Sequence, residues 1–156
     1  MQDKRHFPDI SRKGVYCLIF KNEACTLDAG RLKNIEFFKG YHVYVGSALG
    51  SGGLKRLKRH VLLSLDKNRK PRWHVDYLSF SGVFELISVV YSITDVSVEC
   101  EIAGELAAGL SAAVPHFGSG DCNCPSHLYY SKKRPHSAVK DAFSGIGLKS
   151  KVAHFR

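Results

Sequence analysis

The sequence predicts an α+β fold in which a small three-stranded antiparallel or mixed sheet is flanked by helices. Two observations support this class. The 156 residues, of which 44% are hydrophobic and 24% are charged, suit one globular domain. Along the chain, two strand-like segments precede a helical one, and a third strand and a further helix follow. The first two strands are separated by an insertion.

Two apolar segments near the N-terminus have the pattern of strands. Residues 14–20 are rich in apolar and β-branched side chains, and residues 41–47 alternate in polarity. The insertion between them, residues 21–40, holds a short apolar group around Ile35 and Phe37. We expect it to form either a long connection or an additional hairpin.

Residues 54–65 have the pattern of an amphipathic helix after a glycine-rich turn. Ser51 is placed to cap its first turn. Arg56 and His60 are four positions apart, so they share a face that points away from the core. The apolar stripe consists of Leu54, Leu57, Val61 and Leu65.

The following segments predict one more strand and one more helix. Residues 72–80 fit either a short helix or an extended segment, and residues 83–92 fit a strand. Residues 96–110 repeat an apolar residue every four positions, which predicts a helix that Asp95 can cap.

The C-terminal part of the sequence is less regular. Residues 115–125 are rich in Gly, Pro and Ser and predict a loop, and residues 128–130 predict a short closing strand. We therefore expect one domain over residues 1–130. Residues 131–156 form a basic C-terminal extension that we expect to fray in the absence of a partner.

The net charge of +9 is unevenly distributed. Residues 55–72 carry eight Lys or Arg and one acidic residue, whereas residues 73–130 carry seven acidic residues and no Lys or Arg. Residues 131–156 carry seven Lys or Arg and one acidic residue. Such basic segments suit a polyanion such as nucleic acid, and the acidic middle suits a divalent cation. A merely solvated surface is the alternative explanation for the basic segments.

The sequence also bears on location and redox state. The first residues are polar, and no apolar run approaches the roughly 20 residues that span a bilayer. We therefore expect a cytoplasmic protein with no membrane partner. Five cysteines are an odd number in a chain without an export signal, so we expect reduced thiols and no disulfide framework.

Four short features occur in a distinctive order. Gly14-Val15-Tyr16 and Tyr44-Val45-Gly46 lie in the first two expected strands, and Arg56 and Glu99 lie in two later helices. This set resembles the GIY-YIG nuclease superfamily. Together with the segments YVGSALGSGGLKRLKRH, RWHVDYL, ECEIA and DCNCPSHLYY, it resembles one branch, called domain of unknown function 123. That branch is sometimes fused to endonuclease III-type repair enzymes.

The resemblance implies a GIY-YIG-like fold and a metal-dependent endonuclease that hydrolyses DNA phosphodiester bonds, in DNA repair or processing. It implies that Glu99 binds a single Mg²⁺ or Mn²⁺ ion, a role for which Glu101 and Glu105 compete. The general base stays open between His60, which titrates near neutrality, and Tyr16, whose ordinary pKa is about 10. The residues expected in catalysis are Tyr16, Tyr44, Arg56, His60 and Glu99.

Further side chains are expected to contact nucleic acid. Ser47 stands where related repair nucleases have a lysine, so Lys55, Lys58 or Arg59 would supply that phosphate contact. Trp73 can either stack on an unpaired base or belong to the core. The full set is Ser47, Lys55, Lys58, Arg59, Trp73, His74 and His127.

A second cluster of polar side chains lies in the expected loop. Structural zinc usually has four ligands, so a fourth would have to come from Cys17, Cys100 or His74. We therefore disfavour zinc and expect hydrogen bonds within the loop or to substrate. The members of the cluster are Asp121, Cys122, Cys124 and His127, with His74 and Asp76 elsewhere in the chain.

Two alternatives to an enzyme fit the same residues. One is a non-catalytic module that binds DNA or RNA and retains the fold, and the other is a small zinc-stabilised interaction domain. The complete set of tyrosines, arginine and glutamate favours the enzyme. We expect DNA rather than RNA as the partner, together with a DNA-repair protein.

Overall fold

The computed structural model describes residues 11–118 and 124–155, and over these residues the fold is α+β, as predicted. The strands are β1 (Gly14–Asn22), β2 (Cys25–Ala29), β3 (Leu32–Phe37), β4 (Gly40–Ala48), β5 (Phe84–Ile93), β6 (Ala112–Ala113), β7 (Leu128–Ser131) and β8 (Lys151–His154). The helices are α1 (Lys55–Asp66), α2 (His74–Phe80), α3 (Glu99–Gly109) and α4 (His136–Gly145).

The main sheet has six antiparallel strands in the order β6-β7-β4-β1-β5-β8. The predicted layout of three strands is therefore too small. Strands β4, β1 and β5 form the centre, and short strands of two to four residues extend both edges. Such strands are too short to produce an alternating pattern, and the sequence predicts only β7. The insertion 21–40 contains the β2–β3 hairpin, a separate two-stranded sheet.

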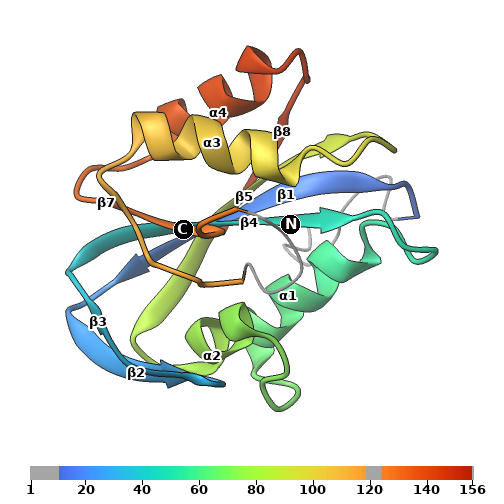
Figure 1. Ribbon diagram of the computed structural model, residues 1–156. Coiled ribbons are helices and arrows are strands. Elements are labelled where there is room, and N and C mark those ends of the chain that lie inside the picture. The colour runs from blue at the N-terminus through green and yellow to red at the C-terminus, as the bar shows by residue number, and fades with distance from the viewer. Residues whose placement is uncertain (1–10, 119–123, 156) are drawn as a thin grey trace.

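Helices cover both faces of the main sheet. Figure 1 shows α1 and α2 on one side and α3 and α4 on the other. Successive residues of β1 alternate between the two cores: Tyr16 and Leu18 pack on the α1–α2 side, whereas Cys17 and Ile19 pack on the α3–α4 side. This two-sided burial explains why β1 reads as a continuous apolar run.

Both predicted helix caps are wrong. The residue that precedes α1 is Leu54 and the one that precedes α3 is Val98, and neither makes a side-chain capping bond. The helices begin four residues after Ser51 and Asp95, which lie too early in the chain to cap them. Within the described residues, no helix is long and apolar enough to cross a membrane.

The described part of the C-terminal extension is folded, so the prediction that it frays is wrong. Val139, Ala142 and Phe143 bury one side of α4, and β8 pairs with β5. After β8, the backbone N–H of Phe155 donates to the carbonyl of Ile87, and the Phe155 ring is buried. This extension closes the second edge of the sheet, a tertiary role that its own weak pattern does not reveal.

Candidate active site

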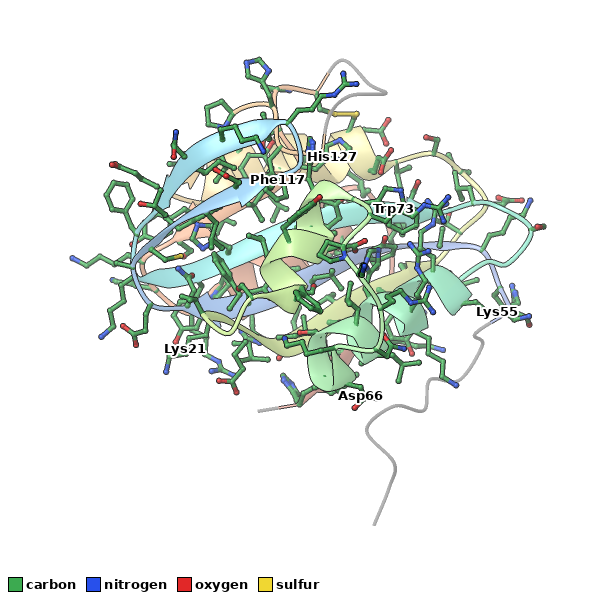
Figure 2. All side chains as sticks on the ribbon, turned by 90° about the horizontal axis from the view of Figure 1, so that it is seen from below. Lys21, Lys55, Asp66, Trp73, Phe117 and His127 are labelled. Atoms are coloured by element: carbon green, nitrogen blue, oxygen red, sulfur yellow. A yellow bond between two sulfur atoms is a disulfide. The ribbon has the colours of Figure 1, made fainter. Side chains whose placement is uncertain are left out.

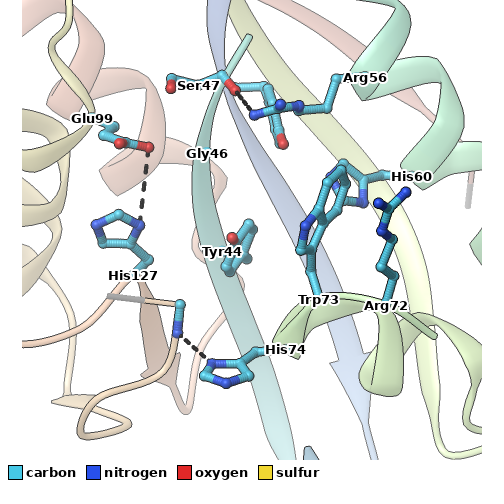
Figure 3. Close-up of a pocket in the computed structure, with 12 residues that line it drawn as sticks. Tyr44, Gly46, Ser47, Arg56, His60, Arg72, Trp73, His74, Glu99 and His127 are labelled. Atoms are coloured by element: carbon cyan, nitrogen blue, oxygen red, sulfur yellow. Dashed lines mark hydrogen bonds and ion pairs between the residues drawn. The ribbon is translucent and has the colours of Figure 1, made fainter. Parts of the chain in front are cut away.

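A pocket of about 360 Å³ lies where the α1–α2 side of the sheet meets the start of α3 (Figure 3). It brings together nine residues that the sequence singles out, namely Tyr16, Tyr44, Ser47, Arg56, His60, Trp73, His74, Glu99 and His127. The remaining lining residues are Gly46, Arg72 and Gly118. Lys55, Lys58 and Arg59 belong to α1 but do not line the pocket.

The register of β1 and β4 brings the two motif tyrosines to the pocket. Tyr16 pairs with Gly46, and Tyr44 lies two residues before Gly46, so both side chains point to the same face. A Cβ atom on residue 46 would lie 2.6 Å from Cζ and Oη of Tyr16, so only glycine allows this approach. Burial, followed by the neighbouring Tyr44, raises the pKa of Tyr16 well above its usual value. The phenol is therefore a hydrogen-bond donor at neutral pH.

Arg56 extends from the first turn of α1 over the end of β4. Its Nη1 donates to the backbone carbonyl of Ser47 at 3.1 Å, and its Cζ lies 5.2 Å from the centre of the Trp73 ring. The carbonyl bond uses one of the five N–H donors of the guanidinium. One edge of the guanidinium is thus held by the Ser47 carbonyl, and Arg56 itself is exposed and lines the pocket.

Glu99 reaches the pocket although α3 covers the opposite face of the sheet. Strand β7 pairs with β4 only as far as Tyr44, and the His127 carbonyl then accepts from the Val45 amide at 2.9 Å. Glu99, the first residue of α3, lies near His127, where the pairing of β4 with β7 ends. Oε2 of Glu99 is 4.0 Å from Nδ1 of His127, and the Glu99 side chain is 25% exposed.

The structure separates Glu99 from the two competing glutamates. Glu101 and Glu105 are exposed and do not line the pocket, and Glu105 lies beside Gly145 of α4. His127 is buried, and this burial lowers the pKa of its imidazole, while Glu99 acts in the opposite direction. His127 is therefore a neutral neighbour of Glu99. Among the described residues that line the pocket, Glu99 is the one with an acidic side chain.

His60 is buried rather than turned away from the core, which corrects its predicted orientation. Its Nδ1 lies 3.5 Å from Oδ1 of Asp76, and its ring centre is 5.6 Å from that of Tyr16. Burial lowers the pKa of His60, whereas Asp76 raises it. The Asp76 carboxylate favours the tautomer with a proton on Nδ1, which leaves Nε2 as an acceptor.

Asp76, which the sequence analysis sets beside the loop cluster, lies instead behind His60 in this site. Its Oδ2 accepts the backbone N–H groups of Arg72 and Trp73 at 2.9 Å each. Burial raises the pKa of Asp76, but His60 and the two backbone donors outweigh it, so the pKa is lowered and the group is ionised. Its place in the first turn of α2 has a sequence signal: Asp76 comes three positions after Trp73, the residue that precedes the helix, which is the spacing of a capping carboxylate.

Trp73 is half-buried and lies outside the two hydrophobic cores, and it lines the pocket. The Arg59 guanidinium carbon lies 3.7 Å from the centre of its ring, and the His60 ring centre is 5.6 Å away. Arg59 therefore supports Trp73 and does not face the pocket. Lys55 is exposed and lies towards the outer end of α1, away from Trp73 and His127 (Figure 2).

The loop before β7 closes the pocket on the α2 side. His74 Nδ1 accepts the Gly118 amide at 2.9 Å, and burial lowers the pKa of His74, so its imidazole is neutral. Gly118 has φ of +70°, and a Cβ atom there would lie 2.9 Å from Tyr44. Phe117 beside it is fully buried against the rings of Tyr44 and His74.

Comparison with known families assigns the chain to a group without a described activity. Residues 15–148 match the family model of the domain of unknown function DUF123. The chain belongs to the DUF123 family. No curated protein and no solved structure matches it. Every residue that lines the pocket lies within the part of the chain that matches DUF123.

The pocket of this DUF123 chain offers a defined set of chemical groups. Two arginines, Arg56 and Arg72, supply positive charge, and Glu99 supplies hard oxygen ligands. Phenols and neutral imidazoles supply hydrogen-bond donors and a proton acceptor. These groups suit an anionic substrate and a reaction that moves a proton.

The redox expectation for the cysteines is corrected by the structure. Cys100 in the first turn of α3 forms a disulfide with Cys124, 24 positions later, and their Cα atoms are 5.9 Å apart. Cys17 is a free buried thiol and Cys25 a free half-buried one. Asp121 and Cys122, which belong to the predicted loop cluster, lie outside the described residues.

Proposed function

We propose that this chain is a GIY-YIG-type endonuclease that hydrolyses DNA phosphodiester bonds with the help of a divalent metal ion. One observation carries the proposal: Tyr16, Tyr44, Arg56 and Glu99 come from four separate segments and line one pocket. Arg56 of α1 lines this pocket, and Lys55 and Lys58 of the same helix suit the DNA backbone.

Arg56 is the residue proposed to stabilise the transition state. Hydrolysis of a phosphodiester increases the negative charge on the phosphate oxygens, and a guanidinium can contact two of them through parallel donors. The bond to the Ser47 carbonyl fixes its orientation before substrate arrives. Ser47 thus contributes through its backbone, a role that does not require the lysine found in related nucleases.

Glu99 is the residue proposed to hold the metal ion. Mg²⁺ and Mn²⁺ favour oxygen ligands and commonly retain several waters, so one carboxylate together with substrate phosphate fits this requirement. Of the described residues that line the pocket, Glu99 is the one with a carboxylate. The ion, when bound, would neutralise charge on the reacting phosphate. The His127 ring lies beside this carboxylate, with Nδ1 4.0 Å from Oε2.

His60 is proposed as the general base in preference to Tyr16. The neutral imidazole of His60 has an acceptor at Nε2 in the tautomer that the nearby Asp76 carboxylate, 3.5 Å from Nδ1, favours. Tyr16 instead has a raised pKa, so its phenolate is scarce at neutral pH. We assign Tyr16 a different task, the donation of a hydrogen bond from its phenol to the substrate or to the attacking water.

The substrate proposed is DNA, in repair or processing, and the exposed part of Trp73 is available for stacking on a base that has left the duplex. Lys55 and Lys58 lie on α1 outside the pocket, where they are placed to contact backbone phosphates beyond the scissile one. A DNA-repair protein is the proposed further partner.

The test is cleavage of supercoiled plasmid and of branched or flapped oligonucleotides with Mg²⁺ or with EDTA. We expect cleavage only with the metal, and losses of about 10²–10³-fold in Arg56→Ala and at least about a hundredfold in Glu99→Ala. Two neighbours serve as matched controls. Lys55→Ala controls for Arg56→Ala and should weaken DNA binding while keeping the cleavage rate at saturating DNA. Glu101→Ala controls for Glu99→Ala and should cleave at the wild-type rate. Undiminished cleavage in Arg56→Ala and Glu99→Ala would refute the assignment, and salt-sensitive binding without any cleavage would identify a non-catalytic module.

A further inference from the structure

A cluster of soft ligands lies directly behind the pocket. One atom from each of Cys100, Cys124 and His127, the two sulfurs and a ring nitrogen, lies within 4.8 Å of the others. Cys100 is exposed, Cys124 is half-buried and His127 is buried. The sequence pairs Cys124 and His127 in one motif and leaves the further ligand open between Cys17, Cys100 and His74. The fold brings Cys100, the neighbour of Glu99, to them.

We propose that Cys100, Cys124 and His127 form a binding site for a thiophilic divalent ion of the zinc class once the disulfide is reduced. Thiolate sulfur and imidazole nitrogen are the donors that zinc prefers, at about 2.3 Å and about 2.0–2.1 Å respectively. Tetrahedral coordination at these lengths separates its ligand atoms by roughly 3.3–3.8 Å. The ring nitrogen lies within 4.8 Å of both sulfurs, which is at most about 1 Å beyond that spacing. Reduction of the disulfide frees the two sulfurs to separate to it.

The disulfide is the metal-free, oxidised form of this site. A dithiol reductant supplies two electrons and two protons, the S–S bond breaks, and two cysteine thiols and one oxidised reductant result. Binding of the ion then releases both thiol protons, because the ligands are thiolates. A disulfide oxidant reverses the process by re-forming the Cys100–Cys124 bond and releasing the ion. Since Cys100 is exposed, reductant and metal both have access to it.

Either form joins the first turn of α3 to the segment that carries His127. The disulfide does so through Cys100 and Cys124, and the ion would do so through the same two residues and His127. The donors are soft, unlike the Glu99 carboxylate, so the two sites select different ions. Because this proposal concerns ion binding alone, it goes beyond the proposed nuclease activity and does not depend on it.

The experiment uses the full chain, reduced with a phosphine under anaerobic conditions, exposed to zinc and then desalted. We expect about one zinc ion per chain by elemental mass spectrometry, and thiolate-to-metal charge-transfer absorption when Co²⁺ replaces zinc. Cys100→Ser, Cys124→Ser and His127→Ala should each lose most of the bound ion. Cys25→Ser, which alters a free thiol elsewhere, is the matched control and should retain it.

A second measurement avoids variants that fail to fold. In the reduced wild-type chain, zinc should slow alkylation of Cys100 and Cys124 at least about tenfold, while Cys25 reacts at an unchanged rate. Equal zinc retention in wild type and Cys100→Ser would overturn the proposal, as would unchanged alkylation of Cys100. Loss of the ion in Cys122→Ser with retention in Cys100→Ser would also overturn it, because the ligands would then be those of the loop motif alone.

Discussion

Replacement of Gly46 by alanine tests how the two motif strands build the pocket. The added methyl would lie 2.6 Å from Cζ and Oη of Tyr16 and 2.9 Å from its Cε2. Favourable contacts between such atoms occur at about 3.5–4.0 Å, so the phenol must move by about 1 Å. Tyr16 is only 2% exposed, so a shift of its ring displaces the side chains packed around it. We expect a loss of about 1–3 kcal/mol in the free energy of unfolding.

Urea unfolding measures this cost. For a domain of this size, the midpoint should fall by roughly 1 M with the slope unchanged. Gly52→Ala is the control, because no atom lies within 4 Å of a Cβ there. Tyr16→Leu removes the three atoms that face residue 46, so Gly46→Ala should cost less than about 0.5 kcal/mol in that background. Equal costs of Gly46→Ala in both backgrounds would refute the steric explanation.

Three further predictions concern pH and salt. Burial lowers the pKa of His42 to about 4, against 6.5 in the unfolded chain, so the unfolded chain binds more protons between these pH values. The free energy of unfolding should therefore fall by up to about 3 kcal/mol as the pH drops from 6.5 to about 4. His42→Gln should reduce this pH dependence when unfolding is followed by urea titration. If His60 is the base, single-turnover cleavage should rise through a pH below 6.5 and then stay level, whereas a continued rise towards pH 10 would implicate Tyr16. About five phosphate contacts should give a slope near −4.5 for log affinity against log salt on duplex DNA, and a slope near zero would contradict the proposed basic surface.

The central strands could be predicted because local pattern and tertiary role coincide there. Residues 14–20 and 41–47 are apolar enough to be identified as strands, and the amphipathic pattern of α1 presents Arg56 outside the core. These inferences need only the period of a strand or a helix. The two pocket tyrosines are selected by the motif resemblance, and the register that pairs Tyr16 with Gly46 then places Tyr16 and Tyr44 on one face.

Other parts of the site depend on packing between distant segments and could not be predicted in this way. His60 lies on the polar side of the predicted helix but is covered by α2, which also brings Asp76 to it. Cys100 meets Cys124 because the loop before β7 returns to α3. The C-terminal extension forms α4 and β8 because it completes the sheet edge beside β5. Asp76 has a local signal for its place in the first turn of α2, but none of the contacts between distant segments has one.

The most direct test of the central claim is the cleavage rate of Glu99→Gln at saturating DNA and Mg²⁺, compared with Glu101→Gln. Both variants remove one negative charge from the first turn of α3, but only Glu99 lines the pocket. We expect Glu99→Gln to bind DNA normally and to cleave it at least about a hundredfold more slowly, while Glu101→Gln cleaves at the wild-type rate. Equal cleavage by the two variants would contradict the claim that these separated residues form one metal-dependent active site.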